Sequence, residues 1–320
     1  MKMNVLSDNW QTSATLDAIK IRADLYRTIR VFFEARKVLE VEVPLLGLAA
    51  TVEPFIDSLT TEVIGKRLYL QTSPEFFLKR LLAMNSGDIY SLGKVFRQGE
   101  IGTRHRPEFT LLEWYRVGWD EHRLMGEVVD LVKTIIPDLS VQKLSYRQLF
   151  MEQLGVDPHD SHISELKRVA SGMVDVSDME ALTVDDWLDL IMTHYLEKQL
   201  PHGLVLVFGY PKTKAALAAL GLNHAGQTIA RRFEAYLNGM ELANGYYELI
   251  DAQEQRHRFE EDLKYRNARG FSLPPCDERL LAAMEAGLPP CAGVALGIDR
   301  LLMVLCNTQS IREVISFADG

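Results

Sequence analysis

The chain has 320 residues, 47% of them hydrophobic and 25% charged, so it is long enough to bury a large core. Its formal net charge of -9 disfavours a protein devoted to gripping the phosphate backbone of DNA or RNA. No apolar run reaches the length of about 18 residues that a membrane helix needs, and the N-terminal segment lacks the basic-then-apolar pattern of a signal peptide. These features predict a cytoplasmic protein that does not enter a membrane.

The first half of the chain predicts helices and strands in alternation. Residues 16–36 place apolar side chains at three-to-four spacing among arginines, which predicts an amphipathic helix. Residues 38–44 alternate apolar and acidic side chains and end at a proline, as a strand does. Residues 67–82 predict a strand, a turn and a helix. Two further strands, 94–100 and 108–119, are joined by a polar loop.

The second half begins with a mostly helical stretch, residues 121–200, which we interpret as a helical insertion. A buried strand at 204–208 and a hairpin at 231–249 follow. Residues 293–300, GVALGIDR, predict a short strand that runs into a helix. Strands paired mainly through hairpins, with helices grouped between them, predict an α+β fold around an antiparallel sheet, formed by a single domain over residues 1–320.

The hairpin allows its pairing to be predicted. Asn238-Gly239 is a strong signal for a two-residue type I′ turn. The register that follows pairs Leu237 with Met240, Tyr236 with Glu241, Ala235 with Leu242 and Glu234 with Ala243. The carboxylates of Glu234 and Glu241 then become diagonal neighbours on one face, within reach of a common Mg²⁺ and a phosphate. A solvated polar face of the sheet explains the same pattern equally well.

The strand that follows this turn alternates polar groups. An amide at Asn244, a ring at Tyr246 and a carboxylate at Glu248 suit the wall of a pocket for a small cationic molecule. The same alternation also describes any half-exposed strand.

Residues 95–116, VFRQGEIGTRHRPEFTLLEWYR, gather arginines, acids and aromatic rings in one short span. An arginine fork suits phosphate or carboxylate groups, Phe109 can stack on a purine, and Glu113 can receive a cationic amine. A structural network of salt bridges is the alternative interpretation. The chain contains neither the GxGxxG nor the P-loop pattern, so any ATP is held in another manner.

Together these segments resemble the three motifs of class II aminoacyl-tRNA synthetases. The helix and strand that end at Pro44 resemble motif 1, FRQGEIGTRHRPEFTLLE resembles motif 2, and GVALGIDR resembles motif 3. The strings TSPEFFLKRLL, RHRPEFTLLE and NGYYELIDAQEQ resemble the lysine branch of that family. The resemblance runs from about residue 16 to the C-terminal segment. It implies a catalytic domain built on an antiparallel sheet flanked by helices, which activates lysine with ATP and Mg²⁺.

The resemblance also implies a role for individual residues. Arg97 and Arg300 are the implied catalytic residues, because they would neutralise the phosphates of ATP during adenylate formation. The implied ATP site comprises Arg97, Gln98, Gly99, Glu100, His105, Arg106, Phe109, Glu241, Leu242, Gly297 and Arg300. The implied lysine site comprises Ser73, Pro74, Glu75, Glu113, Tyr115, Asn244, Glu248 and Ala295. Glu234 and Glu241 are the implied ligands of Mg²⁺.

The resemblance leaves no residues for the anticodon-binding OB domain of lysyl-tRNA synthetases. That matches a group of paralogues that attach lysine, preferably (R)-β-lysine, to a lysine side chain of translation elongation factor P. Elongation factor P is therefore the expected partner, tRNA is not expected, and motif 1 implies a homodimer. Two other hypotheses are a stand-alone enzyme that acts on tRNA and an amino-acid sensor without catalytic activity.

Two positions depart from the family pattern. Ala295 stands where lysyl-tRNA synthetases have glycine, and the added methyl group either favours the β-amino acid or is a packing variation. Gly99 stands where the family usually has glutamate, with Glu100 after it. Either Glu100 replaces the missing contact, or the contact is dispensable.

Overall fold

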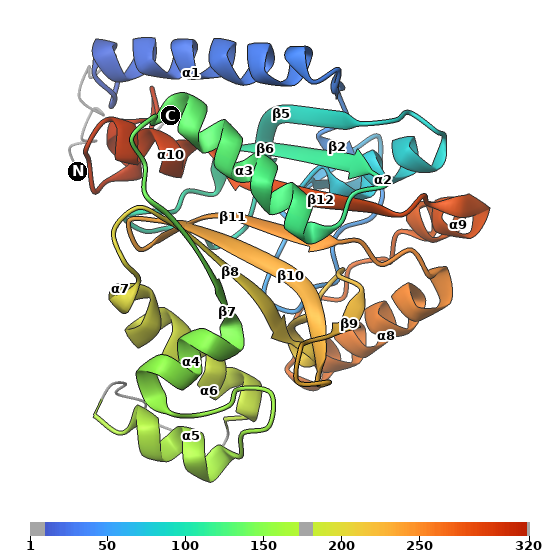
Figure 1. The fold of residues 1–320 in the computed structure, drawn as a ribbon. Helices are drawn as coiled ribbons and strands as arrows, with labels where there is room; N and C mark the ends of the chain where they lie inside the picture. The colour runs from blue at the N-terminus through green and yellow to red at the C-terminus, as the bar shows by residue number, and fades with distance from the viewer. Residues whose placement is uncertain (1–9, 173–181, 319–320) are drawn as a thin grey trace, which may run out of the picture.

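The computed structural model describes residues 10–172 and 182–318 of the chain, and Figure 1 shows their arrangement. The helices are α1 (Leu16–Ala35), α2 (Glu75–Ala83), α3 (Glu121–Ile135), α4 (Tyr146–Leu154), α5 (Ile163–Ala170), α6 (Val184–Ile191), α7 (Glu197–Gln199), α8 (Ala252–Ala268), α9 (Glu278–Gly287) and α10 (Ile298–Leu305). Three shorter turns of helix are η1 (Met192–Leu196), η2 (Lys212–Lys214) and η3 (Ile311–Glu313).

The strands form two sheets within this part of the chain. The large sheet has the order β1-β5-β6-β12-β11-β10-β8-β7, with β9 paired to β10, and a small sheet has the order β2-β4-β3. The strands are β1 (Leu39–Glu40), β2 (Leu46–Gly47), β3 (Thr60–Val63), β4 (Lys66–Leu70), β5 (Ile89–Phe96), β6 (Glu108–Val117), β7 (Val141–Ser145), β8 (Leu204–Pro211), β9 (Leu220–Leu222), β10 (Thr228–Leu237), β11 (Met240–Tyr247) and β12 (Cys291–Gly297).

The predicted α+β architecture is confirmed, with one refinement of strand direction. Most neighbours in the large sheet are antiparallel, but β1 with β5 and β7 with β8 are parallel pairs. The predicted strand at 38–44 is also shorter than expected, because only Leu39–Glu40 pairs with β5.

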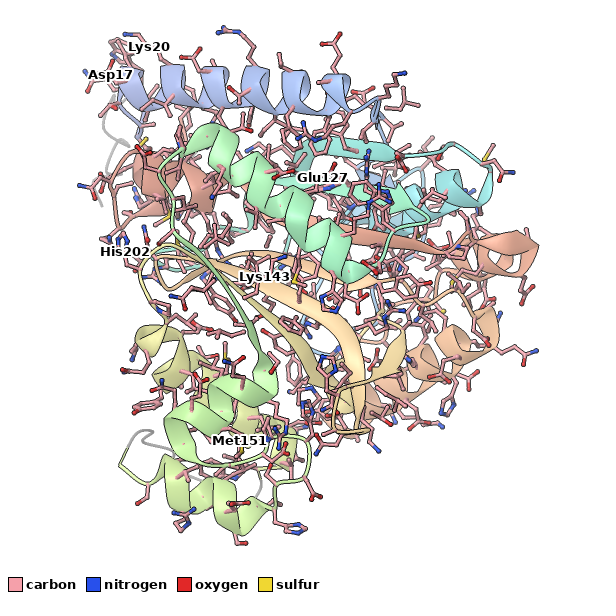
Figure 2. All side chains as sticks on the ribbon, in the orientation of Figure 1. Asp17, Lys20, Glu127, Lys143, Met151 and His202 are labelled. Atoms are coloured by element: carbon pink, nitrogen blue, oxygen red, sulfur yellow. The ribbon has the colours of Figure 1, made fainter. Side chains whose placement is uncertain are left out.

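Helix α1 confirms the amphipathic pattern at the N-terminal end. The Thr15 side chain accepts a hydrogen bond from the Ala18 amide and so caps the helix. Leu25, Ile29 and Phe33 face the core against α3. Figure 2 shows Asp17 and Lys20 at the outer end of this helix, where they form an exposed ion pair of 3.2 Å.

The two faces of strand β6 carry different chemistry, because side chains alternate along a strand. Leu112 and Trp114 point into the main core, and the Trp114 indole donates a hydrogen bond of 3.0 Å to Glu127 of α3. Glu113 and Tyr115 point to the opposite face, where α2, α8 and α9 form a second core. The alternation therefore places acidic and aromatic groups on the face opposite α3.

The predicted helical insertion, 121–200, has a different extent in the structure. Helix α3 packs on the main sheet, and β7 (Val141–Ser145) joins the edge of that sheet as a strand. Figure 1 shows α4, α5, α6 and α7 gathered at one end of the molecule. They pack around a core of their own, which includes Phe150, Trp187 and Ile191, against the far end of β8 and β10.

The hairpin of β10 and β11 has the predicted turn but not the whole predicted register. Asn238 and Gly239 both have positive φ, as a type I′ turn requires. Tyr236 pairs with Glu241 as expected, but a bulge follows, and Glu234 pairs with Asn244 instead of Ala243. The predicted pairings of Ala235 and Glu234 are therefore wrong by one residue, because a bulge inserts an extra residue into one strand.

Candidate active site

A cavity of about 340 Å³ opens on the sheet face opposite α3. Strands β6, β11 and β12 form its floor, and the start of α2 and the segment 47–58 form its walls. The volume lies in the range of pockets for small molecules. Most of the residues that the sequence analysis selected lie around this cavity.

One end of the cavity is acidic and buried. Glu113 is only 2% exposed and accepts hydrogen bonds from Ser73 Oγ at 2.7 Å and from the Tyr115 hydroxyl at 2.8 Å. Burial and, to a smaller extent, the neighbouring Glu75 carboxylate raise the pKa of Glu113 to about 8. Tyr115 and Ser73 thus position an acid that suits a cationic side chain.

A buried lysine shares this acidic end. Lys79 of α2 forms ion pairs of 2.7 Å with Glu75 and 2.6 Å with Glu248, and its side chain is 1% exposed. Burial lowers the pKa of Lys79, but the two carboxylates overcome this and hold it above its ordinary value. Burial raises the pKa of Glu248 to about 7 although Lys79 opposes that change. Sequence reasoning missed Lys79.

Strand β12 shapes the floor beside these acids. A methyl group at Gly293 would lie 2.3 Å from Tyr115 Cε1 and 2.5 Å from Glu248 Oε1, so only glycine fits there. Ala295 pairs with Glu113 on one side and with Asn244 on the other. The methyl group of Ala295 thus lies between two predicted lysine-binding residues.

The opposite end of the cavity is cationic. Arg300 donates to the Glu241 carbonyl at 2.8 Å and to the Glu241 carboxylate at 3.2 Å. Arg300 Nη2 lies 2.7 Å from His105 Nε2. Burial lowers the pKa of His105 and Arg300 lowers it further, so the imidazole is neutral and accepts this hydrogen bond.

The contacts of Arg97 bear on the departure at Gly99, where the family usually has glutamate. Gly99 has a φ of 82°, a conformation that favours glycine, and the turn brings Glu100 back to Arg97 at 3.3 Å. Glu100 therefore contacts the arginine, and replacement of the family's glutamate by Glu100 stays a prediction. The Arg97 guanidinium lies 5.1 Å from the centre of the Phe109 ring. Arg300, the other predicted catalytic arginine, bonds to His105 and Glu241.

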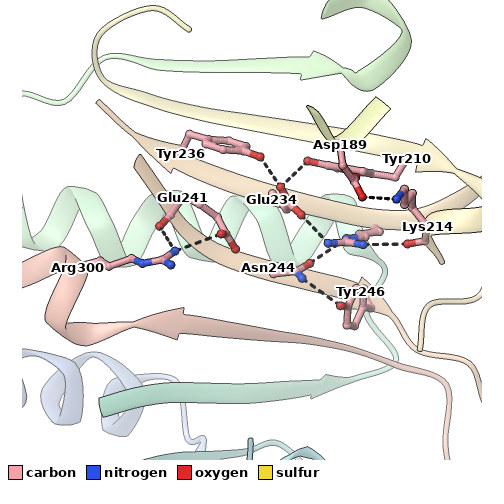
Figure 3. A network of polar contacts seen from close by, with 10 residues as sticks. Asp189, Tyr210, Lys214, Glu234, Tyr236, Glu241, Asn244, Tyr246 and Arg300 are labelled. Carbon is pink, nitrogen blue, oxygen red and sulfur yellow. Dashed lines mark hydrogen bonds and ion pairs between the residues drawn. The ribbon is translucent and has the colours of Figure 1, made fainter. Parts of the chain in front are cut away.

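Glu234 belongs to a polar network beside the cavity, shown in Figure 3. Its carboxylate accepts hydrogen bonds from the Tyr210 hydroxyl at 2.7 Å, from Arg232 at 2.6 Å and from the Tyr236 hydroxyl. Arg232 also donates to Asn244 Oδ1 at 3.2 Å. Glu241 is the freer of the two predicted metal ligands, because 41% of its side chain is exposed.

The cavity gathers most of the predicted site residues, but four lie outside its lining. The predicted residues that line it are Ser73, Glu75, Arg97, Glu100, His105, Arg106, Phe109, Glu113, Tyr115, Glu241, Leu242, Asn244, Glu248, Ala295, Gly297 and Arg300. The four outside are Pro74, Gln98, Gly99 and Glu234. Pro74 precedes α2 as its N-cap, and Gln98 forms a backbone bridge with Asp57, so both shape the walls.

Several lining residues were not predicted as ligands. Glu53 lies on an irregular segment with no recognisable motif. Lys79 is not part of the lining but binds the lining residue Glu75, four residues before it, a spacing that usually marks a surface ion pair. Asp299 bonds to Arg22 of α1 and to the Thr110 amide, and so ties the C-terminal helix to β6. Only the three-dimensional structure shows these relations.

Among residues 10–172 and 182–318 we found no group of three or more His, Cys, Asp or Glu side chains that could hold a metal ion. The same residues contain no helix that is long and apolar enough to cross a membrane.

The chain belongs to the class II tRNA synthetase family. The family model described as tRNA synthetases class II (D, K and N) matches residues 4–319. The predicted class of fold is thereby confirmed, and family membership supports the use of ATP.

Curated relatives match the chain over nearly their full lengths. A protein named "Elongation factor P--(R)-beta-lysine ligase" from Pseudoalteromonas translucida is 43% identical over 317 residues, 96% of this chain and 97% of that protein. Proteins of the same name from Proteus mirabilis and Hamiltonella defensa are 42% and 41% identical, with 98% and 97% of both chains covered.

Proposed function

We propose that this protein activates (R)-β-lysine with ATP and attaches it to a lysine side chain of translation elongation factor P in the cytoplasm. The observation that carries the proposal is the cavity itself, which has a buried acidic end for an amine and a cationic end for a triphosphate. The acceptor is taken from the names of the relatives, because those proteins are 42–43% identical to this chain and match it over nearly its whole length.

The first step forms an aminoacyl-adenylate. The substrate carboxylate attacks the α-phosphorus of ATP, and pyrophosphate leaves. Arg97 would bridge the carboxylate and the α-phosphate, and Arg300 with His105 would hold the outer phosphates. No protein nucleophile is needed, because positioning and charge neutralisation supply the catalysis.

Magnesium fits the nucleotide end on the chemistry of its oxygen donors. Mg²⁺ is usually bound by one or two carboxylates together with substrate phosphates. Glu241 presents a half-exposed carboxylate to the cavity and would be the direct ligand. Glu234, which lies outside the cavity lining and is held by Arg232 and two tyrosines, would be the second carboxylate. The ion would neutralise the phosphates of ATP.

The acidic end would take the amino acid. Glu113 and Tyr115, with Glu248, would receive the side-chain ammonium, while Ser73, Glu75 and Asn244 would face the other amino group and the carboxylate. Ala295 lies between Glu113 and Asn244, so its methyl group narrows the floor where the backbone end of the substrate rests. This position supports a role for Ala295 in preferring the β-amino acid.

A homodimer is part of the proposal. Helix α1 and the strands after it carry exposed apolar side chains that a partner copy would cover: Val31, Leu39, Leu45, Leu46 and Leu48. Covering such a surface in a two-fold interface removes apolar area from water. Sedimentation analysis of the wild type and of Leu46→Asp measures this directly, with dissociation expected for the variant.

The intact mass of elongation factor P tests the function. The factor is incubated with the protein, Mg-ATP and either lysine or (R)-β-lysine, and tRNA charging is assayed in parallel. We expect the mass of one lysyl group to be added, faster with the β isomer, and no addition by Arg300→Ala. An unmodified factor together with charged tRNA would instead support the stand-alone tRNA enzyme.

A further inference from the structure

Glu53 stands apart from the other acids of the cavity. The remaining carboxylates that line it are each engaged: Glu75 and Glu248 with Lys79, Glu100 with Arg97, Glu113 with Ser73 and Tyr115, Glu241 with Arg300, Asp277 with backbone amides of α9, and Asp299 with Arg22. Glu53 is the one lining carboxylate in the described residues that makes no hydrogen bond or ion pair.

The backbone at this position is held firmly even though the carboxylate is free. The buried Arg266 of α8 donates to the Glu53 carbonyl at 2.8 Å, and the Thr51 hydroxyl accepts from the Glu53 amide at 3.2 Å. Arg266 is itself anchored by Asp57 and Ser272. A buried arginine thus fixes the backbone of the one lining acid whose carboxylate is unpaired.

Glu53 lies on the same side of the cavity as Arg97. Both residues line the cavity, and the Gln98 amide donates a hydrogen bond of 2.8 Å to the Asp57 carbonyl, which joins the segment of Glu53 to that of Arg97. The charged and titratable groups that face Glu53 are Glu75 of α2, Arg97 after β5, Arg232 of β10, Tyr246 of β11 and Asp262 of α8. Because the proposed function places Arg97 on the substrate carboxylate and the α-phosphate, the acyl-phosphate bond would form on this side of the cavity.

The exposure of Glu53 separates it from the amino-acid end. Glu113 and Glu248 are 2% and 1% exposed, whereas Glu53 is an exposed residue of the cavity lining. Desolvation by the surrounding protein atoms raises its pKa, although Arg97 opposes the change. An exposed carboxylate of the lining is accessible to an incoming acceptor amine.

We propose that Glu53 is the catalytic residue that receives the ammonium group of the acceptor lysine and removes its proton for the transfer step. This inference rests on the proposed function. An ammonium has no lone pair, so one N–H bond must break first, and the proton passes to the Glu53 carboxylate. The amine then forms the N–C bond, the bond from carbon to the phosphate oxygen breaks, and AMP leaves with the electron pair. The nitrogen releases its remaining extra proton to solvent, which leaves a neutral amide.

A single-turnover experiment separates this role from adenylation. The enzyme is loaded with ATP, Mg²⁺ and (R)-β-lysine and is then mixed with one of three acceptors: elongation factor P, Nα-acetyl-lysine amide or hydroxylamine. Hydroxylamine is uncharged at neutral pH and needs no base. We expect Glu53→Gln to slow transfer to both lysine acceptors by about 10²-fold, since general-base catalysis contributes about 10²-fold or more. Pyrophosphate exchange and the reaction with hydroxylamine should stay unchanged.

Matched variants control for charge and reach. Glu62→Gln removes an exposed acid of β3 outside the cavity and should leave all three reactions unchanged. Glu53→Asp keeps the charge and should restore part of the transfer rate. In the wild type the rate of transfer to a lysine acceptor should rise as the pH passes the raised pKa of Glu53, because the base acts when it is deprotonated. In Glu53→Gln this rise of the transfer rate with pH should be absent.

The outcomes distinguish this inference from the proposed function. Transfer by Glu53→Gln at the wild-type rate overturns the role of Glu53. So does a parallel fall in pyrophosphate exchange, or a higher KM for the amino acid, which would place Glu53 on the substrate instead. If the wild type modifies the small amine but not the factor, the proposed acceptor is wrong and the Glu53 effect is still measured. Reaction with hydroxylamine alone would overturn both.

Discussion

The two ends of the cavity differ in how their charges are balanced. At the amino-acid end, the buried Lys79 forms ion pairs with the half-buried Glu75 and the buried Glu248, and a third acid, Glu113, is buried nearby. At the nucleotide end, Arg97 and Arg300 each contact one acid, Glu100 and Glu241 respectively, and all four side chains are partly exposed. The acidic end is therefore rigid and selects a cation by shape and charge. The cationic end can rearrange around a flexible triphosphate.

The difference teaches how one small cavity serves two unlike ligands. Burial strengthens electrostatic interactions at the acidic end but requires that every charge have a partner. At the nucleotide end, exposure to water weakens each electrostatic interaction, and the high charge of a triphosphate compensates for that weakening. Loss of a group at the first end should therefore affect folding as well as binding, whereas loss at the second should affect catalysis alone.

The largest effect is expected at the nucleotide end. Arg300→Ala should reduce pyrophosphate exchange by about 10³-fold, because an arginine on the transferring phosphates is worth that much or more. The free energy of unfolding should remain within ~1 kcal/mol of the wild type, since 23% of the side chain is exposed. Exchange kinetics and urea denaturation measure both. Arg279→Ala on α9 is the matched control, and an equal loss in that variant would contradict the assignment.

At the acidic end, Lys79→Met should destabilise the fold by about 3–5 kcal/mol, because it leaves the buried carboxylate of Glu248 and the half-buried one of Glu75 without their cation. Urea denaturation measures this change. Lys20→Met, which removes an exposed lysine of α1 paired with Asp17, should cost less than ~1 kcal/mol. Comparable losses in the two variants would show that the buried ion pairs do not stabilise this end.

Ala295→Gly should change selectivity with little effect on stability. Removing one methyl group from the floor should shift the ratio of kcat/KM values for β-lysine and lysine by about 10-fold or more, or roughly 1–3 kcal/mol. Pyrophosphate exchange with each isomer gives the ratio. An unchanged ratio would leave Ala295 as a packing residue.

The smallest effect is a pH dependence at the acidic end. Burial holds the pKa of Glu113 at about 8, so the group is neutral below that pH and becomes a carboxylate as the pH rises. The KM for lysine should fall between pH 6 and 8, by at most about tenfold per pH unit. In Glu113→Gln only the part due to Glu248, with a pKa of about 7, should remain. A KM that rises with pH in the wild type would contradict this charge assignment.

Sequence reasoning was most successful where local patterns determine structure. The α1 periodicity, the Asn238-Gly239 turn and the alternation along β6 each follow from nearest neighbours, and all three are present in the structure. Most of the residues selected from the motifs also line one cavity, and their roles there stay predictions. Alternation alone predicted that Glu113 and Tyr115 share a face.

It was least successful where a distant segment decides the outcome. The bulge in β11 moved Glu234 opposite Asn244, and no residue type in the hairpin signals that bulge. The burial of Lys79 depends on Glu248, which lies far along the chain and arrives through β11. Strand β7 was missed because its pairing with β8 joins segments about 60 residues apart.

The position of β12 has a consequence for the synthesis of the protein. This strand, the last one among the described residues, lies in the middle of the large sheet, between β6 and β11. Until β12 has left the ribosome, the sheet exists only as two halves, each with an unpaired apolar edge. Such edges are sites of aggregation. A nascent chain of this protein should therefore depend on chaperones until β12 has emerged, and a truncation that removes β12 should be unusually damaging.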